Sequence, residues 1–425
     1  MSHRLASFSR AFKYRNYKLF FIGQAISLIG TWMTQVATAW LVYRLTGSAL
    51  LLGVVGFSSQ IATFLLAPLA GVFTDRCNRR WILTITQCLS ALQSLALAVL
   101  TLRHHIQIHH ILVLSVFQGL ISAFDIPARQ AFLVEIVQKR ADLSNAIALN
   151  TVMFNGARLI GPTIAGFVIA WGGEGSCFLI DAVSYLAVIA TLFMLQLGVC
   201  AAPPPRLPVL QELKEGVSYA VHFLPIRALL LLVAFTSLVA SYSVMFPVIA
   251  RDVLRGGPST LGFITAATGF GALVGGIYLA SRRDVRGLLR LIAGSSFVFG
   301  ASLMCLSATK TLWMALTVLF VTGFSMIIQL AASNTVLQTL VDDDKRGRIM
   351  SLYMMALLGM TPWGSLLAGA ITTHAGISVT LFIQGAASLI IAGIFFGQLP
   401  RLKKVIRPIY VKMGIIPVLP SPTEG

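Results

Sequence analysis

Charged residues are scarce in this chain, and their scarcity excludes whole classes of protein. Of 425 residues, 11% are Asp, Glu, Lys or Arg, whereas 57% are apolar and the mean hydropathy is +0.85. This composition lies far outside the soluble globular range, so we expect a polytopic membrane protein. The formal net charge is +18, but the basic residues stand in short clusters between apolar runs. That pattern is typical of membrane topology, and no nucleic-acid partner is expected.

Motifs of enzyme and metal chemistry are absent as well. The chain has no GxxxxGK[ST] stretch for ATP and no HExxH, and its loops are too short for a catalytic module. The five cysteines form no CxxC pair, so neither a disulfide framework nor a zinc site is expected. A flexible loop with several histidines gives only a weak reason to expect metal: His104, His105, His109 and His110. We therefore expect no enzyme, no cofactor and no metal.

Apolar windows long enough to cross a bilayer, which takes about 20 residues, recur along the whole chain. They lie at residues 19–43, 48–73, 81–102, 111–136, 145–170, 176–198, 226–250, 259–281, 288–308, 312–340, 347–372 and 376–398. The prediction is an all-α polytopic membrane protein with twelve transmembrane helices in two six-helix halves. The first window follows a basic segment and is too long for a cleaved signal peptide, so we interpret it as an uncleaved span.

A Pro-rich segment separates the two sets of windows. Pro203-Pro204-Pro205 and Pro208 mark a linker, and residues 211–215 begin a polar, interfacial helix. We predict an N-terminal half at residues 1–199, a cytoplasmic linker at 200–225, and a C-terminal half with a basic tail at 226–425. With both termini cytoplasmic, few basic residues fall in the expected outer loops. These are Arg44, Arg103, Arg251, Arg255 and Lys310.

The two halves match each other at an offset of about 203 to 204 residues. Asp125 falls on Gln329, and Ala165-Gly166 falls on Ala368-Gly369. Parallel repeats of this kind place a substrate path at their interface near the middle of the membrane. A chance alignment of helices rich in Gly and Ala is the alternative explanation.

The turn between the second and third windows contains Gly71, Asp75, Arg76, Arg79 and Arg80 in the spacing Gly-x-x-x-Asp-Arg-x-x-Arg-Arg. This spacing resembles the loop signature of the major facilitator superfamily. The resemblance covers nearly all of residues 8–399, and it implies that the two halves rock against each other. In related folds the acid of this loop meets the start of the eleventh span when the cytoplasmic side is closed. Glu135 lies within reach of the same turn, as a gate or as a structural partner. The predicted cytoplasmic gate comprises Gly71, Asp75, Arg76, Arg79, Arg80 and Glu135.

A second stretch resembles a Gly-Pro motif of proton-coupled exporters in the same superfamily. Its residues Gly161, Pro162 and Gly166 are expected to permit a helix bend or close helix approach. Ser115 stands where many members have an Arg, so the usual proton-coupling Arg of the fourth span is absent. The series that begins at Asp125 is similar to the exporter branch that includes the enterobactin exporter and macrolide-efflux proteins.

Charges inside apolar windows are the residues from which we predict the chemistry. Asp125 and Arg158 lie at similar depth, and a lone charge there costs at least about 3 kcal/mol, so we expect them to pair. Arg129 is one turn from Asp125 and can share its carboxylate. Two interpretations stay open: a structural ion pair, or a site where Asp125 takes up a proton or the arginines bind an anionic group. Asp181 is either a second titrating site or the partner of a polar group at the outer surface.

The C-terminal half has no charge near the middle of the membrane. Polar and aromatic side chains are candidates for a neutral side of the cavity, although lipid contact is the alternative for any single aromatic. They are Gln329, Asn334, Gln338, Trp363, Tyr242 and Phe246.

These features predict a secondary active transporter, a proton-coupled antiporter that exports a small amphipathic or anionic molecule such as a siderophore or a drug. Its expected partners are this substrate, protons and the lipid bilayer, and we expect a monomer in a bacterial inner membrane. One alternative is a transporter of lysolipids or other solutes, and another is a non-transporting membrane receptor. The export direction follows only from the resemblance, because symmetric halves permit either direction.

Overall fold

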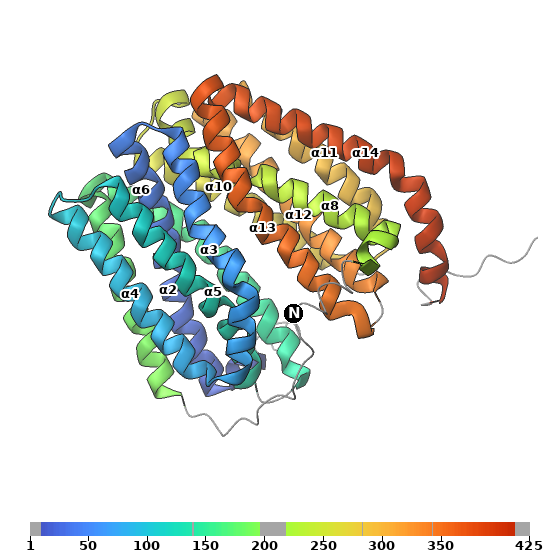
Figure 1. Ribbon diagram of the computed structural model, residues 1–425, viewed down its shortest axis with the longest axis horizontal. Coiled ribbons are helices and arrows are strands. Elements are labelled where there is room, and N and C mark those ends of the chain that lie inside the picture. Colours follow the sequence, from blue (N-terminus) through green and yellow to red (C-terminus); the bar gives the residue numbers. More distant parts are fainter. Residues whose placement is uncertain (1–9, 138–139, 196–217, 283, 342, 413–425) are drawn as a thin grey trace, which may run out of the picture.

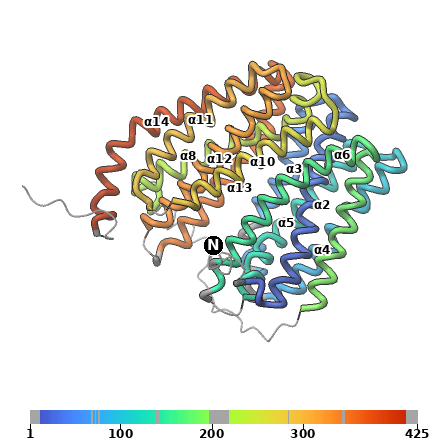
Figure 2. The backbone as a smooth tube through the Cα atoms, turned by 180° about the vertical axis from the view of Figure 1, so that it is seen from behind, coloured from blue at the N-terminus to red at the C-terminus, as the bar shows by residue number. Residues whose placement is uncertain are grey.

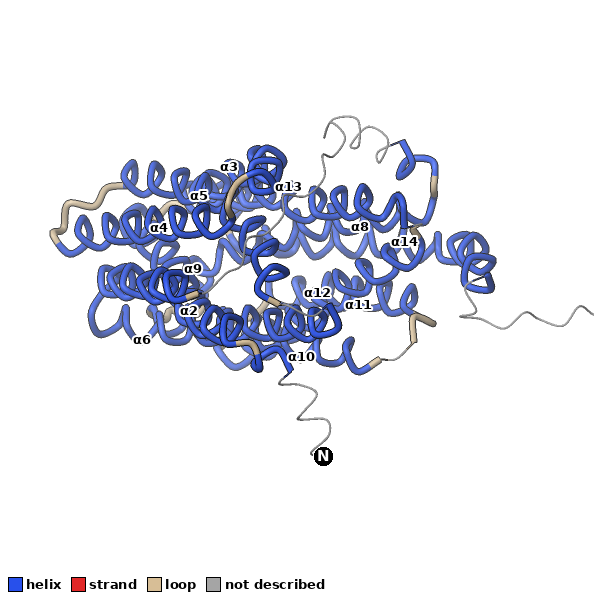
Figure 3. Tube along the Cα trace, turned by 90° about the horizontal axis from the view of Figure 1, so that it is seen from below, coloured by secondary structure: helices blue, strands red, loops and turns tan. Residues whose placement is uncertain are grey.

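The computed structural model describes residues 10–137, 140–195, 218–282, 284–341 and 343–412. Every regular element in these ranges is a helix (Figure 3). The elements are η1 (Arg10–Lys13), α2 (Arg15–Thr46), α3 (Ala49–Arg76), α4 (Arg79–Leu102), α5 (Ile108–Ile136), α6 (Arg140–Met194), α8 (Leu224–Ala240), η2 (Ser241–Met245), α9 (Phe246–Val248), η3 (Ile249–Val253), α10 (Pro258–Ser281), α11 (Leu288–Ser307), α12 (Leu312–Leu340), α13 (Asp343–Ala375) and α14 (Ile377–Lys412).

Short turns between these helices carry residues that stop one helix and start the next. Gly47 ends α2 in the left-handed conformation, with φ at 60°, which glycine adopts without a Cβ clash. Ser48 then caps α3, because its hydroxyl accepts the N–H of Leu51 at 3.3 Å. Asn78 caps α4 in the same way through the N–H of Arg80 at 3.0 Å. The apolar runs therefore fold back on one another as helical hairpins.

The observed helices confirm the predicted all-α membrane fold. Eleven helices in the described part of the chain are long and apolar enough to cross a membrane. One of them, α6, has 55 residues and is broken at Gly173, where φ is 73° and ψ is 176°. Since about 20 residues suffice for one crossing, α6 accounts for both the fifth and the sixth predicted spans. Residues 196–217, which hold most of the predicted linker, lie outside the described residues, so the domain boundaries stay a prediction.

The seventh predicted span is not one regular helix, contrary to expectation. The α-helix α8 ends at Ala240, a 3₁₀ turn follows as η2, and a π-helical turn forms η3. Pro247 lies between them and has no N–H to donate to a helical ladder. At the start of this stretch the Ser241 hydroxyl donates to the carbonyl of Thr361 on α13 at 2.8 Å. Tyr242 therefore lies in a 3₁₀ turn and not in a regular α-helix.

Two helical bundles make up the molecule. Helices α2–α6 lie on one side and α8–α14 on the other, and the two views of Figures 1 and 2 agree on this division. The main contacts between the bundles join α3 to α13 and α6 to α10. We call the end that contains the turn at Gly47 the turn end, and the end at which α2 begins and α14 finishes the terminal end.

The hydrophobic cores show that the bundles meet at one end only. At the turn end a single core contains residues of both bundles, among them Leu41, Leu52, Phe246 and Leu381. At the terminal end there are two cores, one made of residues from 11–195 and one made of residues from 220–410. The bundles are therefore joined at the turn end and packed independently at the terminal end.

Paired glycines bring the two bundles together at the turn end. A Cβ added to Gly53 on α3 would lie 3.2 Å from the Cα of Gly369 on α13. A Cβ added to Gly262 on α10 would lie 3.2 Å from the Cα of Gly166 on α6. The internal repeat aligns Gly166 with Gly369, so each of the two contacts includes one glycine of this aligned pair. Such contacts between backbones need residues without a side chain.

Candidate transport site

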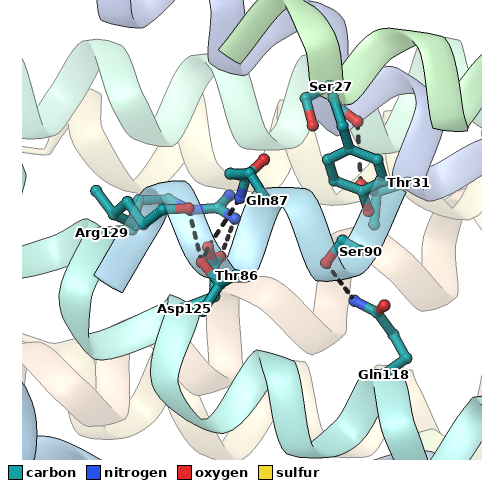
Figure 4. Close-up of polar contacts among 10 residues, drawn as sticks. Ser27, Thr31, Thr86, Gln87, Ser90, Gln118, Asp125 and Arg129 are labelled. Carbon is teal, nitrogen blue, oxygen red and sulfur yellow. Dashed lines mark hydrogen bonds and ion pairs between the residues drawn. The ribbon is translucent and has the colours of Figure 1, made fainter. Parts of the chain in front are cut away.

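Asp125 on α5 lies at the centre of a buried polar cluster in the first bundle. The residue is 6% exposed, and its carboxylate accepts hydrogen bonds from the Thr86 hydroxyl at 2.9 Å and the Gln87 amide at 2.8 Å (Figure 4). Arg129, one helical turn further along α5, forms an ion pair with the same carboxylate, as the spacing predicts. The charge of Asp125 is therefore compensated within its own helix.

Arg158 does not pair with Asp125, so the predicted ion pair between helices is wrong. The Arg158 guanidinium instead lies over the ring of Trp32, 5.6 Å from its centroid, in a cation–π contact. The reason is the arrangement of the helices: α6 packs mainly on α2, α4 and α10, and only slightly on α5. Within the described part of the chain, no acid forms an ion pair with Arg158.

Asp181 lies on the second segment of α6 and is 1% exposed, which places it inside the bundle and not at the outer surface. Its carboxylate accepts a hydrogen bond from the Ser94 hydroxyl at 2.8 Å and lies 3.5 Å from the Ser184 hydroxyl. Gly30 on α2 leaves room for it, because a Cβ there would lie 2.6 Å from a carboxylate oxygen. Among the described residues no cation pairs with Asp181.

The structure describes the contacts of some of the predicted gate residues but not of all of them. Glu135 pairs with Arg79 at 3.4 Å, and both side chains are less than 20% exposed, so the expected contact is confirmed. Arg80 donates to the backbone carbonyl of Phe193 at 3.2 Å. A Cβ at Gly71 would meet nothing within 4 Å. The side chains of Asp75 and Arg76 lie outside the described residues, so their contact with α13 stays a prediction.

The Gly-Pro motif of α6 provides close helix packing. The backbone stays helical through Gly161, Pro162 and Gly166, and its one non-helical residue within α6 is Gly173. A Cβ at Gly161 would lie 2.6 Å from the Cβ of Trp32 on α2. The motif therefore lets α6 approach α2 on one face and α10 on the other.

The polar candidates of the second bundle do not share one cavity. Gln329 is 1% exposed, and neither atom of its amide has a hydrogen-bond partner among the described residues. It lines a small cavity together with Thr236, Ser296, Phe299 and Ser388. Asn334 and Gln338 lie further along α12, where the Gln338 amide donates to Asn334 at 2.8 Å.

The aromatic candidates of the second bundle also divide into two groups. Tyr242 and Phe246 are buried, with ring centroids 5.6 Å apart, and Phe299 lies 6.3 Å from Tyr242. Trp363 on α13 is 48% exposed and packs edge-on against Phe57 of the first bundle at 5.3 Å. Trp363 therefore belongs to the contact between the bundles.

Sequence reasoning missed a group of polar contacts at the turn end. The Tyr43 hydroxyl of α2 donates to Asp252 of η3, and Arg251 lies 5.7 Å from the centroid of the Tyr43 ring. Arg44 pairs with Glu174 just beyond the break in α6, at 2.7 Å. The sequence signal that could have revealed these contacts is the presence of two acids, Glu174 and Asp252, in predicted outer loops that hold few charges. The Tyr43 contacts join the two bundles and must break if the turn end opens.

Removing Arg129 is expected to destabilise the first bundle. Breaking a buried ion pair leaves an uncompensated charge, so Arg129→Gln should lower the free energy of unfolding by about 3 kcal/mol. Asp125→Asn combined with Arg129→Gln should lose much less, and thermal unfolding of the purified protein in detergent measures both. Arg103→Gln, at an exposed loop residue, is the control. Equal losses in the single and double variants would contradict a compensating role for Arg129.

Comparison with known proteins agrees with this architecture. Residues 6–407 match the family model described as transmembrane secretion effector, a branch of the major facilitator superfamily. The chain belongs to this family. It is 27% identical to the staphyloferrin A transporter of Staphylococcus aureus, over 91% of this chain and 97% of that protein. It is 26% identical to the multidrug efflux pump Tap of Mycolicibacterium fortuitum, over 88% and 93% respectively.

Solved structures of transporters share the fold. A POT family transporter in complex with 5-aminolevulinic acid superposes with a TM-score of 0.74, at 10% identity, over 91% of this chain and 96% of that one. The resemblance predicted from the loop signature is therefore confirmed, and the chain is a multi-pass membrane transporter with bacterial relatives. Relatives of this kind act on small molecules.

Proposed function

We propose that this protein is a proton-coupled antiporter that exports a small amphipathic or anionic molecule, siderophore-like or drug-like. The names of its relatives, a staphyloferrin A transporter and a multidrug efflux pump, support this substrate class. The protein acts as a monomer in a bacterial inner membrane, with both termini in the cytoplasm, and it catalyses no chemical reaction. Its two six-helix halves, divided at the linker of residues 200–225, rock to expose the site to each side in turn.

The proposal of proton coupling rests on one observation, the buried Asp181 carboxylate to which no described cation is paired. An ionised carboxylate inside a membrane bundle costs free energy unless a cation compensates it. Among the described residues, Asp181 has hydroxyl groups as neighbours and no cation paired with it. Asp125, by contrast, has Arg129. Uptake of a proton by Asp181 removes this free-energy cost, and release of the proton restores the cost. The bundle therefore has two states that differ in the protonation of Asp181. Asp125 then maintains the structure that surrounds the site.

The uneven packing of the bundles supports alternating access. They share a core at the turn end and have separate cores at the terminal end. In the predicted topology the terminal end faces the cytoplasm, so this conformation is the one in which an exporter takes up its substrate. Release on the other side requires the contacts at the turn end, including Tyr43 with Asp252, to separate.

Transport into inside-out vesicles with an imposed pH gradient tests the proposed function. Siderophores, macrolides, dyes and lysolipids form the panel, and a protonophore that dissipates the gradient is the control. Accumulation of a siderophore or a drug only while the gradient lasts is the expected result. Accumulation of lysolipids alone would favour the lipid transporter, and binding without flux of any compound would favour the receptor.

A further inference from the structure

Arg158 lies beside aromatic side chains of the first bundle and has no ion-pair partner among the described residues. The partly buried guanidinium lies between the bundles, over the ring of Trp32. Phe154, one turn earlier on α6, packs edge-on against Trp32 at 5.8 Å and is 46% exposed. A cation thus borders an accessible aromatic surface formed by α2 and α6.

The charge of Arg158 is not compensated by the described part of the chain. Asp125 pairs with Arg129, and Glu135 pairs with Arg79, but no acid pairs with Arg158. An arginine near the middle of a spanning helix is costly to place in the membrane without an anionic partner. The cation–π contact with Trp32 offsets only part of this cost. An anion is the partner that such an arginine lacks.

Tyr242 provides a second donor from the opposite bundle. Its side chain is 1% exposed, and its hydroxyl has no hydrogen-bond partner among the described residues. The nearby hydroxyl of Thr268 donates to the carbonyl of Ile264 at 3.1 Å. Tyr242 is close enough to Arg158 for the two to interact electrostatically.

The backbone between these donors is built for close approach. A Cβ at Gly269 of α10 would lie 3.2 Å from the carbonyl oxygen of Arg158. Glycine at this position lets α10 pack directly on α6 beside the guanidinium. The Arg158 and Tyr242 donors therefore lie at the line of contact between the two bundles, and an anion held by both would respond to their relative position.

We propose that Arg158, with Tyr242 as second donor and Trp32 and Phe154 as an apolar platform, binds the carboxylate of an amphipathic substrate. This proposal rests on the proposed transport function and specifies its substrate class. The planar guanidinium can form two parallel hydrogen bonds with a carboxylate, a geometry that lysine does not provide. The apolar part of the substrate lies against the rings of Trp32 and Phe154.

Binding of an acid and its ester separates this role from a structural one. The probes are 11-(dansylamino)undecanoic acid and its methyl ester, titrated against purified protein by dansyl fluorescence. Arg158→Gln should weaken binding of the acid about tenfold, which is about 1.4 kcal/mol, and leave binding of the ester unchanged. Arg158→Lys should give an intermediate loss, and Tyr242→Phe a smaller one. Arg103→Gln should bind both probes as the wild type does.

Several results would overturn the carboxylate site. They are equal affinity of Arg158→Gln and wild type for the acid, an equal loss for the acid and the ester, and binding of neither probe by the wild type. If Arg158→Gln does not fold, Arg158→Lys and Tyr242→Phe still distinguish the acid from the ester.

A failure of the transport function gives a different result. In that case the wild type would prefer the acid in the binding titration, but neither probe would accumulate in vesicles under a pH gradient. Accumulation of the ester and not of the acid by Arg158→Gln vesicles would support both proposals.

Discussion

Asp181→Asn is expected to abolish substrate accumulation driven by a pH gradient and to leave substrate binding within about twofold of wild type. Asparagine has nearly the shape of aspartate and keeps an oxygen that can accept from Ser94, so the bundle should fold. It cannot exchange a proton, so the transport cycle loses its coupling step. Uptake into inside-out vesicles, with and without the gradient, measures the effect.

Substrate exchange without a gradient distinguishes a coupling role of Asp181 from a structural one. If Asp181 only maintained the structure, its replacement would also reduce exchange. Vesicles preloaded with unlabelled substrate should still exchange it for labelled substrate in Asp181→Asn, since exchange needs only the rocking of loaded protein. Asp125→Asn is the matched acid in the same bundle, and its main expected effect is on stability because its partner is Arg129. Accumulation by Asp181→Asn that still depends on the gradient would exclude Asp181 as the proton carrier.

The fold was largely predictable because membrane insertion is a one-dimensional problem. Apolar length and the distribution of basic residues determine where helices cross the membrane. The predicted spans agree with the helices except in two places: α6 covers two spans with a break at Gly173, and the seventh span becomes irregular after Ala240. The contact of Arg129 with Asp125 was also predictable from sequence position, because residues four apart on one helix lie on the same face.

The contacts between helices were less predictable, because depth in the membrane does not specify which helices are neighbours. Asp125 and Arg158 were assigned similar depths, but α6 turns Arg158 toward Trp32 and away from α5. The contact of Tyr43 with Asp252 joins residues 209 positions apart, and it depends on the irregular turns after α8. Neither relation has a local signal in the sequence.

Three glycines on α10 provide the second large prediction, because valine at each has a different expected effect. At Gly262 the added Cβ would lie 2.6 Å from the carbonyl oxygen of Pro162 in the other bundle. Gly262→Val should therefore separate the bundles at the turn end and reduce transport more than tenfold, with thermal stability reduced only slightly. A cysteine introduced at Ser259, beside this contact, should become more accessible to a membrane-impermeant maleimide.

Gly271 faces the inside of its own bundle, so its replacement should act on folding. A Cβ there would overlap the carbonyl oxygen of Phe320 on α12. Helix backbones cannot yield as the end of a flexible side chain can, so Gly271→Val should greatly reduce the yield of folded protein. At Gly276 a Cβ would meet nothing within 4 Å, and Gly276→Val should fold and transport as wild type does.

The comparison of these variants separates alternating access from simple stability. If the turn end must close for substrate to be taken up, Gly262→Val loses transport in a folded protein, whereas Gly271→Val loses the folded protein itself. Equal transport by Gly262→Val and Gly276→Val would mean that the contact of α6 with α10 is not part of the transport cycle. In that case the remaining contacts at the turn end, among them Gly53 with Gly369 and Tyr43 with Asp252, would hold it closed.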